Sequence, residues 1–385
     1  MALTPYPLFL TTKMGLYLHI PFCRQRCHYC DFYFVTNNKL QEEFTRSIII
    51  ELERRKDELD ISKPIQSIYF GGGTPSLLET KYLEQIFEKI YNIYQVSENA
   101  EITLEANPDD IDLQKLNELK SLPINRLSVG IQSFFEEDLK WMNRAHNKQQ
   151  ATACLDNIAL AGFNNISADL IYGFDILSNE KWMQNLDKIA QYPHIKHLSC
   201  YQLTVEPKTP LEKLIKNGTY KNSPDEKFVE QFEILMDWID KNNFSQYEIS
   251  NFSKPGYAAV HNSNYWKGLP YLGLGPSAHS YDGINIRKKN TASLGDYIIN
   301  PLQFEIENLS TQNLYNEYIM TRLRTSSGIN LNEVKSVFGD GYYNHIYNML
   351  KEEDISDYII IENDIIILNK SGKLLADGIA ASLFI

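Results

Sequence analysis

Leu16-Tyr-Leu-His-Ile-Pro-Phe-Cys-Arg-Gln-Arg-Cys-His-Tyr-Cys-Asp-Phe32 combines a short β-rich run with three closely spaced cysteines. Cys23, Cys27 and Cys30 have the spacing C-x3-C-x2-C. Three thiolates on one loop can hold three of the four irons of a [4Fe–4S] cluster. The fourth iron then has no ligand from this loop and can bind a substrate or cofactor. The count of three therefore predicts a chemical role rather than a structural one.

A structural zinc ion is the main alternative for the three cysteines, with His28 or His19 as the fourth ligand. His28 lies between two of the cysteines, which makes convergence on one ion awkward, and no second Cys/His pair follows at zinc-finger spacing. A disulfide is less favoured, because three cysteines cannot pair internally. Cys154 and Cys200 stand alone and are interpreted as small buried hydrophobic residues.

The composition predicts a large core and a reducing, cytoplasmic setting. The chain has 385 residues, 43% of them apolar, which suffices for more than one domain. Its net charge of −12 disfavours general nucleic-acid binding, which needs a basic surface. No apolar run reaches the length of a membrane span, and the first residues lack the pattern of a secretory signal.

Short β-rich runs alternate with longer amphipathic runs up to residue 242. Strands are predicted at Leu16–Ile20, Ser67–Phe70, Glu101–Leu104, Arg126–Val129, Ile166–Ile171 and His197–Leu203. Helices are predicted near Lys39–Leu59, Glu79–Tyr94, Asp112–Lys120, Gln149–Ala161, Glu180–Gln191 and Pro224–Asn242. Six βα units in a row imply an α/β fold with a parallel sheet and outer helices. Six is fewer than the eight of a closed TIM barrel, so we expect a partial (β/α)6 barrel.

Polar residues and glycines follow each predicted strand. In order along the chain, they are the three cysteines, Gly71-Gly-Gly-Thr-Pro75, Glu105 with Asn107 and Pro108, Gly130 with Gln132 and Ser133, Asp169 with Tyr172 and Gly173, and Tyr201 with Gln202 and Thr204. In βα barrels the active site is built at the carboxyl ends of the strands. Because polar residues or glycines follow six consecutive strands, the sequence predicts an active site at the carboxyl ends of these strands.

The glycine run, Glu105 and Arg144 can each contact a ligand. The glycine run allows close backbone approach, and its free N–H groups can hold a carboxylate or an amine-bearing ligand, although a tight turn explains glycines as well. Glu105 can accept from both hydroxyls of a ribose, with a helix cap or a surface charge as the alternative. Arg144 can pair with a carboxylate, with a solvated surface arginine as the alternative.

From Leu16 to about Ser280, the sequence resembles the radical S-adenosylmethionine (SAM) proteins that include oxygen-independent coproporphyrinogen III oxidase and the HemW-type heme chaperones. The stretches that carry the resemblance are Tyr17-Leu-His-Ile-Pro-Phe-Cys23, Gly71-Gly-Gly-Thr-Pro-Ser76, Glu105-Ala-Asn-Pro108, Ser128-Val-Gly-Ile-Gln-Ser-Phe134, Asp169-Leu-Ile-Tyr-Gly173 and Tyr201-Gln-Leu-Thr204. The resemblance implies that SAM chelates the open iron. It implies SAM contacts for Tyr17, Gly72, Gly73, Thr74, Glu105, Gln132, Arg144 and Asp169.

Two features are more similar to the chaperones than to the oxidase. The oxidase pattern carries a further cysteine two residues after the third, where this chain has Phe32, and it has a longer segment before the cluster. His261-Asn-Ser-Asn-Tyr-Trp266 matches the H-N-x-x-Y-W motif of the chaperones. His261 offers a nitrogen to heme iron, Asn262 can orient the imidazole, and Tyr265 and Trp266 supply aromatic area for a porphyrin face. A buried histidine among core aromatics is the alternative, and His279 is a second candidate ligand.

The predicted domains are an N-terminal extension over 1–14, the radical SAM barrel over 15–250, a heme-motif and linking segment over 251–312, and a C-terminal domain over 313–385. The extension has no periodic pattern, so we expect it to be poorly ordered, and Met14 is an alternative start. Helices at Asn313–Arg324, Leu331–Phe338, Tyr343–Leu350 and Lys373–Leu383, with strands at Tyr358–Ile361 and Ile365–Leu368, predict a small α+β domain like a winged helix. Because this domain is rich in Asp and Glu, we expect a covering or partner-binding role.

The leading hypothesis is therefore a heme chaperone that binds a [4Fe–4S] cluster, SAM and heme, and delivers heme to apo-hemoproteins. Membrane-bound respiratory proteins are among the acceptors that the resemblance implies, and dimerisation occurs in the group. The alternative is oxygen-independent coproporphyrinogen III oxidase, which decarboxylates its substrate by radical chemistry. Radical modification of RNA is a third class, which the net charge opposes. The sequence does not decide whether SAM is cleaved.

Overall fold

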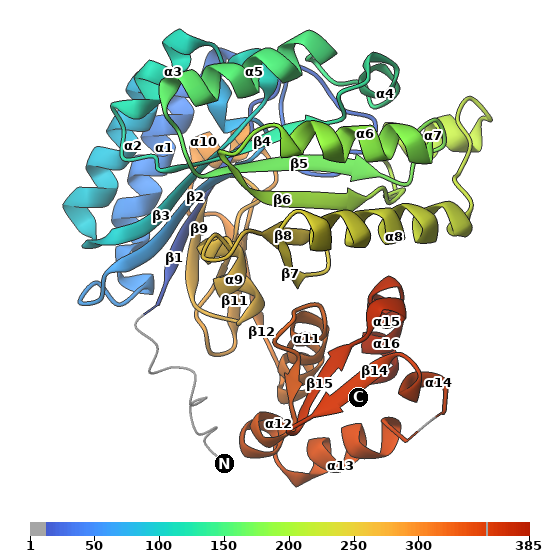
Figure 1. Cartoon of the computed structure of the whole chain (residues 1–385). Coiled ribbons are helices and arrows are strands. Elements are labelled where there is room, and N and C mark those ends of the chain that lie inside the picture. The colour runs from blue at the N-terminus through green and yellow to red at the C-terminus, as the bar shows by residue number, and fades with distance from the viewer. Residues whose placement is uncertain (1–12, 352) are drawn as a thin grey trace.

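Six parallel strands form the centre of a curved twelve-stranded sheet in this computed structural model, which describes residues 13–351 and 353–385 (Figure 1). The strands follow one another in sequence order across the sheet. They are β1 Gly15–Ile20, β2 Ile65–Gly72, β3 Val96–Ala106, β4 Arg126–Gln132, β5 Ile166–Tyr172 and β6 Ile195–Gln202. The predicted partial (β/α)6 barrel is confirmed, with boundaries within a few residues except in β3, which starts earlier.

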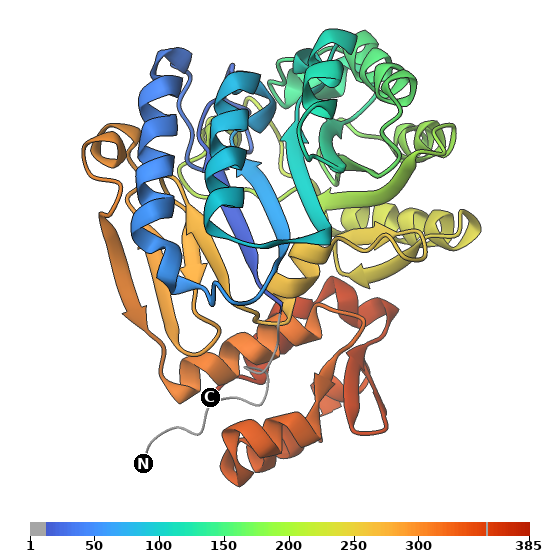
Figure 2. The same ribbon diagram turned by 90° about the vertical axis from the view of Figure 1, so that its left-hand side faces the viewer.

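The helices of the barrel lie outside this sheet (Figures 1 and 2). They are α1 Gln41–Arg55, α2 Thr80–Ile93, α3 Leu113–Lys120, α4 Glu136–Trp141, α5 Lys148–Ala161, α6 Asn179–Ala190, α7 Pro210–Lys216 and α8 Asp225–Lys241. Short 3₁₀ turns span Asn38–Leu40, Lys56–Glu58, Pro75–Leu77 and Pro108–Asp110. The apolar residues of each long helix lie on one side and cover the outer face of the strands. This is why they recur in the sequence with the 3.6-residue period of a helix.

Strand β2 illustrates how the sequence divides the two faces of the sheet. Successive side chains of a strand point to opposite faces. Ile68 and Phe70 are fully buried against the outer helices, whereas Ser67 and Tyr69 bond to polar groups in the interior of the barrel. Alternating apolar and polar residues therefore build an apolar outer core and a polar lumen.

Both flanks of the barrel carry further strands. On one flank, β9 Tyr271–Leu274 pairs parallel with β1, and β10 His279–Tyr281, β11 Ile286–Asn290 and β12 Phe304–Asn308 continue the sheet in antiparallel fashion. On the other flank, β8 Asn251–Ser253 pairs antiparallel with β6, and β7 Ser245–Glu248 pairs with β8. The short helices α9 Val260–Trp266 and α10 Leu294–Ile299 lie in the same segment. The stretch 251–312, predicted as a heme-motif and linking segment, thus contributes strands β8 to β12 to the main sheet.

A buried ion pair fastens α1 to the β9–β10 flank. Arg55 Nη1 lies 2.6 Å from Glu51 Oε1, and Arg55 also donates to the Gly273 carbonyl at 3.1 Å and to Ser280 Oγ at 2.9 Å. Glu51 accepts in addition from the Tyr297 hydroxyl at 2.6 Å. Removing one partner of such a pair leaves an uncompensated buried charge, which typically costs about 3–5 kcal/mol. The sequence did not predict strands β9 to β12, because their runs are short and the first of them, β9, pairs with β1 far away in the chain.

The C-terminal part folds around a hydrophobic cluster of its own below the barrel (Figures 1 and 2). It contains α11 Thr311–Leu323, β13 Ile329–Asn330, α12 Leu331–Phe338, α13 Asp340–Met349, α14 Glu353–Ser356, β14 Ile359–Glu362, β15 Ile365–Leu368, α15 Lys370–Leu374 and α16 Ala376–Ser382. The expected hairpin is β14–β15, and β13 adds a third strand. The expected last helix is two helices, which meet at Leu375.

A few polar contacts join this domain to the barrel. Glu248 and Thr325 form an isolated antiparallel bridge, and the Ser326 N–H donates to the Tyr247 carbonyl at 3.0 Å. Most of the expected N-terminal extension lies outside the described residues, but Met14 is buried and its carbonyl accepts from the Gln66 N–H at 3.0 Å. In the described part of the chain, no helix is both long enough and apolar enough to cross a bilayer.

Candidate functional site

The three cysteines lie on the loop that follows β1, at the carboxyl end of the barrel. All three thiols are free of disulfide bonds and partly exposed. Burial, followed by repulsion from the Cys27 thiol, raises the pKa of Cys23 to about 11 and that of Cys30 to about 12. Thiols that hinder one another's ionisation become thiolates together only when a cation neutralises them. Because a cubane offers a separate iron to each thiolate, this loop fits a [4Fe–4S] cluster.

The same loop does not favour a single zinc ion. Among residues 13–351 and 353–385, no group of three His, Cys, Asp or Glu side chains is placed to hold one metal ion. The two histidines considered as fourth ligands are held by backbone carbonyls instead. His28 Nδ1 lies 2.8 Å from the Trp141 carbonyl, and His19 Nε2 lies 2.8 Å from the Tyr33 carbonyl.

Arg144 ties the cysteine loop to the ends of β3 and β4. Its Nη1 donates to Cys27 Sγ at 3.3 Å, and its Nη2 donates to Asn107 Oδ1 at 2.5 Å and to the Gly130 carbonyl at 3.0 Å. Its Nε–H is buried and has no partner among the described residues. A buried donor without an acceptor costs about 1–3 kcal/mol. This donor is therefore suited to an acceptor group on a ligand, such as a carboxylate.

The glycine run at the end of β2 is required by close packing. Gly72 has a φ of +107°, which disfavours other residues, and a Cβ at Gly73 would lie 2.8 Å from the Ile20 carbonyl oxygen. The N–H of Gly72 donates to Glu105 Oε2 at 3.2 Å, and the N–H of Gly73 donates to the Ile20 carbonyl at 2.8 Å. These N–H groups are thus already used within the protein, so the expectation that they stand free for a ligand is not met. Thr74 Oγ1 lies 3.6 Å from Cys23 Sγ, which links the run to the cysteine loop.

Glu105 is held from below by Tyr69, whose hydroxyl donates to Glu105 Oε1 at 2.7 Å. Burial raises the pKa of Glu105 to about 7, with Asp169 adding repulsion, while the Tyr69 and Gly72 hydrogen bonds and Arg126 oppose the rise. The carboxyl group therefore changes charge near neutral pH. When ionised, it can accept from ligand hydroxyls.

The remaining residues expected to bind SAM surround this point. Gln132 adopts a φ of 64°, and its buried Oε1 has no partner among the described residues, so it can accept from a ligand. Asp169 lies in the lumen, where it accepts from Ser128 Oγ at 3.2 Å and from Ser167 Oγ at 3.2 Å. The Tyr17 hydroxyl lies 3.3 Å from His19 Nδ1. The structure thus connects the strand-end residues, although Asp169 has its acceptor sites partly occupied.

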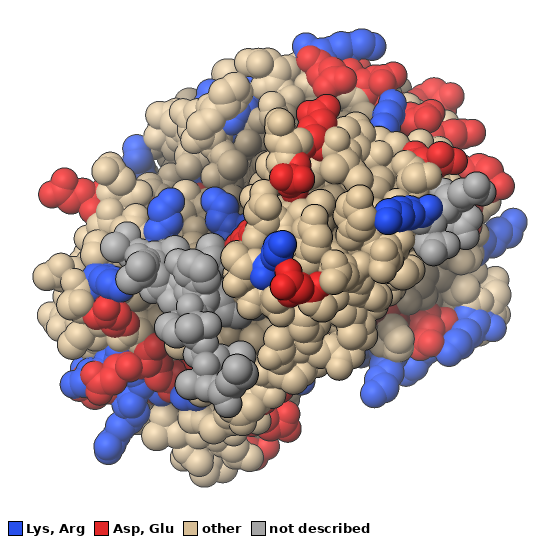
Figure 3. All heavy atoms as spheres, turned by 90° about the horizontal axis from the view of Figure 1, so that it is seen from below, with Lys and Arg blue, Asp and Glu red and all other residues tan. Residues whose placement is uncertain are grey.

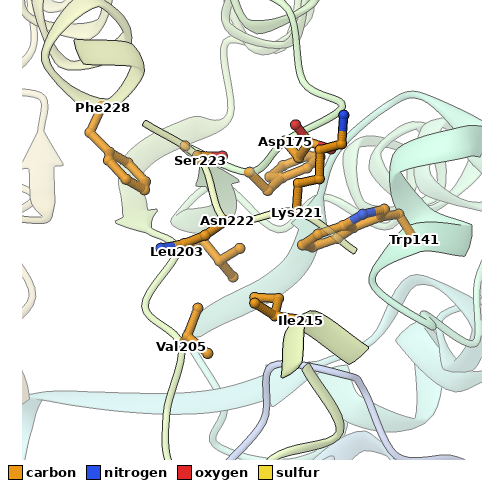
Figure 4. A pocket seen from close by; sticks show the side chains of 11 residues that line it. Trp141, Asp175, Leu203, Val205, Ile215, Lys221, Asn222, Ser223 and Phe228 are labelled. Atoms are coloured by element: carbon orange, nitrogen blue, oxygen red, sulfur yellow. The ribbon is translucent and has the colours of Figure 1, made fainter. Parts of the chain in front are cut away.

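A recess opens beside this site, between the ends of β5 and β6 and the segment around α7 (Figure 4). Its wall includes Trp141, which stacks on Phe174 with ring centroids 5.1 Å apart, and the Lys221 side chain also lines it. Its volume is about 210 Å³, including the space open to solvent. Because this volume also counts open solvent, the enclosed space is small, and we assign no ligand to the recess.

His261 lies in the lumen at the other end of the barrel. Its Nδ1 is 3.0 Å from Ser67 Oγ, and its ring stacks on Tyr69 with centroids 5.1 Å apart. The backbone N–H groups of Val260 and His261 donate to the two carboxylate oxygens of Glu101, both at 2.9 Å. Burial and the Arg126 charge lower the pKa of His261 to about 4. The imidazole is thus neutral and packed among aromatic rings.

The other residues of the H-N-x-x-Y-W stretch point in different directions. Ser67 holds the imidazole Nδ1, the role expected of Asn262. Tyr265 is 51% exposed, whereas Trp266 packs under Arg324, whose guanidinium carbon is 5.6 Å from the indole ring. His279 is exposed on β10. Tyr265 is therefore exposed to the outside, whereas His261 faces the lumen and lines a small recess together with Tyr265.

The cysteines and His261 are far apart, although Tyr69 connects His261 with Glu105: its ring stacks on His261 at 5.1 Å, and its hydroxyl donates to Glu105 at 2.7 Å. His261 borders Gly15, because a Cβ on Gly15 would lie 3.2 Å from its Nδ1, and Gly15 begins β1. Cys23 follows the opposite end of this strand, and six extended residues span about 20 Å. The sequence did not predict this separation. It does not show that α9, which follows the sixth strand in the chain, packs beside the start of β1.

Three further residues contribute to the site, although the sequence did not predict them as ligand contacts. Tyr69 and Asn107 position Glu105 and Arg144, and buried Arg126 acts on the charges of the lumen. Asn107 stands in the strand-end pattern, so that pattern was sufficient to find it. Tyr69 and Ser67 alternate with Ile68 and Phe70, so their inward direction was also readable, but their partners were not.

Comparison with known proteins places these features in a family. Residues 17–189 match the model of the radical SAM superfamily. The heme chaperone HemW of Bacillus subtilis is 32% identical over 374 residues, with 94% of this chain and 97% of that protein covered. The heme chaperone HemW of Synechocystis sp. is 33% identical, with 83% of this chain and 80% of that protein covered.

A solved structure shows the same fold. The coproporphyrinogen III oxidase HemN of Escherichia coli, described as a radical SAM enzyme, superposes with a TM-score of 0.82. The match covers 100% of this chain and 91% of that chain, at 20% sequence identity. At this identity the match supports the architecture and carries no argument about activity.

Proposed function

Because this chain belongs to the HemW family of heme chaperones within the radical SAM superfamily, we propose that it binds heme and delivers it to apo-hemoproteins. The observation that carries the proposal is similarity to the HemW chaperones over nearly the whole chain. A [4Fe–4S] cluster and SAM are the further cofactors of this proposal.

The carboxyl end of the barrel is the proposed cluster and SAM site. Cys23, Cys27 and Cys30 would hold the cluster, whose open iron supplies a coordination position for SAM. Glu105 would accept from the ribose and Arg144 Nε would donate to the SAM carboxylate, which uses a donor that is otherwise unpaired. The other proposed contacts are Tyr17, Gly72, Gly73, Thr74, Gln132 and Asp169.

The proposed heme site is at the opposite end, on the exposed side of the H-N-x-x-Y-W stretch. Tyr265 offers aromatic area there, and a half-exposed ring can gain favourable contact from covering by a porphyrin. His261, Asn262 and Trp266 are the other residues of the proposed site. Because His261 is packed in the lumen, we propose no axial bond from it to iron in this conformation.

Oxygen-independent coproporphyrinogen III oxidation is the second candidate, because the motifs of the barrel resemble those of the oxidase as well as those of the chaperones. Phe32 stands where the oxidase pattern has its further cysteine, and its side chain is 65% exposed. An exposed phenyl ring cannot replace a thiol as a ligand or hydrogen donor. This substitution supports the chaperone over the oxidase.

We also propose a cytoplasmic location, with heme and apo-hemoproteins as partners, membrane-bound respiratory proteins among them. Homodimerisation is a further proposal, and nucleic acid is not an expected partner at a net charge of −12.

Heme titration together with product analysis tests the function. The reconstituted protein should give a saturable change in the Soret band with hemin, and it should transfer heme to an apo-hemoprotein. Incubation with coproporphyrinogen III, SAM and a reductant should yield no protoporphyrinogen IX. Formation of protoporphyrinogen IX would contradict the chaperone proposal and establish the oxidase.

A further inference from the structure

The large sheet ends in a strand with one free side. Strand β12, Phe304–Asn308, pairs antiparallel with β11 and has no strand on its other side among the residues that the structure describes. Figure 2 shows β12 at the margin of the molecule. A strand at the edge of a sheet presents unpaired N–H and C=O groups with which another strand can pair.

The hydrogen bonds at the two ends of β12 show which of its backbone groups are free. The Leu309 N–H donates to the Asn285 carbonyl at 2.8 Å, and the Thr291 N–H donates to the Gln303 carbonyl at 3.1 Å. In an antiparallel pair, successive residues alternate between bonding to the neighbouring strand and facing away from it. The residues of β12 that direct their N–H and C=O groups away from the sheet are therefore Phe304, Ile306 and Asn308.

The side chains of β12 alternate between apolar and acidic. Ile306 is 58% exposed, and the exposed Glu305 and Glu307 on either side of it point to the opposite face of the sheet. Glu307 lies 3.5 Å from Arg287, whereas Glu305 forms no ion pair with any residue in the described part of the chain. Carboxylates alone suffice to protect an edge from unwanted pairing, so protection does not explain the exposed isoleucine between them.

A second copy of this chain is a poor partner for the edge. Every antiparallel register that joins more than one of the outward-facing residues sets a glutamate of β12 directly opposite a glutamate of the other copy. These positions lie between the hydrogen-bonded pairs, where facing side chains approach most closely. Like charges placed in this way destabilise the pairing.

The charges that would select a partner are local to the strand. In the view from below, Lys and Arg side chains are interspersed with Asp and Glu, so that this face shows no broad area of one sign (Figure 3). On β12, by contrast, carboxylates stand at every second position. A strand with basic residues opposite Glu305 and Glu307 would form opposite-charge pairs there, which stabilise a sheet.

We propose that β12 is a docking edge for an extended segment of another protein in which apolar and basic residues alternate. The segment adds a strand to the sheet, and its backbone bonds to the outward groups of Phe304, Ile306 and Asn308. Its basic side chains pair with Glu305 and Glu307, while its apolar side chains cover Ile306 on the other face. The partner is thus selected by its charge pattern, and the inference does not depend on heme binding.

Binding of three synthetic peptides to the full chain tests the backbone part of the proposal. The first is a short fluorescent peptide of alternating valine and lysine, whose binding is followed by fluorescence anisotropy. In the proposed register the valine N–H groups face β12 and the lysine N–H groups face away. N-methylation of the valines should therefore lower the affinity by about tenfold or more, whereas N-methylation of the lysines should leave it within about twofold.

Two variants test the edge itself. Ile306→Pro removes an outward N–H, and proline is tolerated on an edge strand where that group faces solvent. Affinity for the unmodified peptide should fall about tenfold or more in this variant, with folding checked by circular dichroism. Glu305→Lys should lower the affinity about three- to tenfold, because it replaces an attraction by a repulsion. Glu84→Lys, on the exposed side of α2, makes the same change in net charge and should have no effect.

A wild type that does not bind the unmodified peptide would overturn the inference. Equal binding of the valine-methylated peptide would also overturn it, because attraction between the acidic protein and a cationic peptide would then be sufficient. Equal losses in Glu305→Lys and Glu84→Lys would lead to the same conclusion. If sedimentation showed that Ile306→Pro converts a dimer of the wild type to a monomer, the edge would pair two copies of the chain, and the proposed partner would be wrong.

Discussion

The two ends of the barrel differ in how their polar groups are satisfied. At the carboxyl end, Arg144 and Gln132 leave buried atoms unpaired, and crowded thiols resist ionisation. At the other end, His261 is bonded, stacked and neutral, and the unpaired donors are the neighbouring Asn264 and Trp266. Unsatisfied buried groups are costly, so the unpaired atoms of Arg144 and Gln132 are candidates to contact a ligand at the carboxyl end.

The largest expected effect separates the cysteine loop from the buried cysteines. Cys27→Ala should abolish the cluster. The variant loses the thiolate ligand of one iron and also the sulfur that accepts a hydrogen bond from Arg144. Cys154→Ala/Cys200→Ala should retain about four irons per chain after anaerobic reconstitution, as one cubane demands. Iron and sulfide analysis with the absorbance near 400 nm measures both. Loss of the cluster from the second variant would contradict the assignment.

The next effect concerns SAM at the carboxyl end. Glu105→Gln keeps the size of the side chain but removes its charge, and losing a charge-assisted hydrogen bond costs about 1.5–3 kcal/mol. SAM affinity should therefore fall about ten- to a hundredfold in calorimetric titration of the clustered protein. Exposed Glu98→Gln is the matched control. If the upper site is independent of the lower one, hemin affinity should not change in Glu105→Gln.

Stability should reveal the different roles of His261 and Tyr265. His261→Ala removes the Ser67 contact and the stack on Tyr69, so we expect a loss of about 2–3 kcal/mol in the free energy of unfolding. Tyr265→Ala truncates a half-exposed ring and should cost less than about 1 kcal/mol. Urea denaturation of both variants measures this. A fully stable His261→Ala protein with impaired heme binding would restore His261 as a ligand.

The smallest expected effect is a pH dependence of SAM binding. The pKa of Glu105 is raised to about 7, so the ionised form that accepts ribose hydroxyls dominates above that pH and is lost below it. SAM affinity should decrease by up to about tenfold from pH 8 to pH 6. Tyr69→Phe removes a hydrogen bond that favours the charged form, so the decrease should begin at higher pH. A flat profile in the wild type, like that expected for Glu105→Gln, would contradict this role.

Local patterns were enough to predict the barrel and its strand ends. Strand β4, for example, was expected at Arg126–Val129 and is found at Arg126–Gln132, because a buried parallel strand is an apolar run whose boundaries are marked by glycine and polar residues. The flanking strands β9 to β12 were missed, since a strand of four residues such as β9 forms only through pairing with β1, far away in the chain.

The sequence by itself determined the chemistry that depends on spacing: three thiols on one loop, polar residues after successive strands, and the likeness to a family. Only the tertiary structure decided which groups meet. It put His261 and the cysteines at opposite ends of one strand, placed Ser67 rather than Asn262 on the imidazole, and put Tyr69 between His261 and Glu105. The physical reason is that side-chain direction and long-range pairing are set by packing of the whole sheet, which no local stretch encodes.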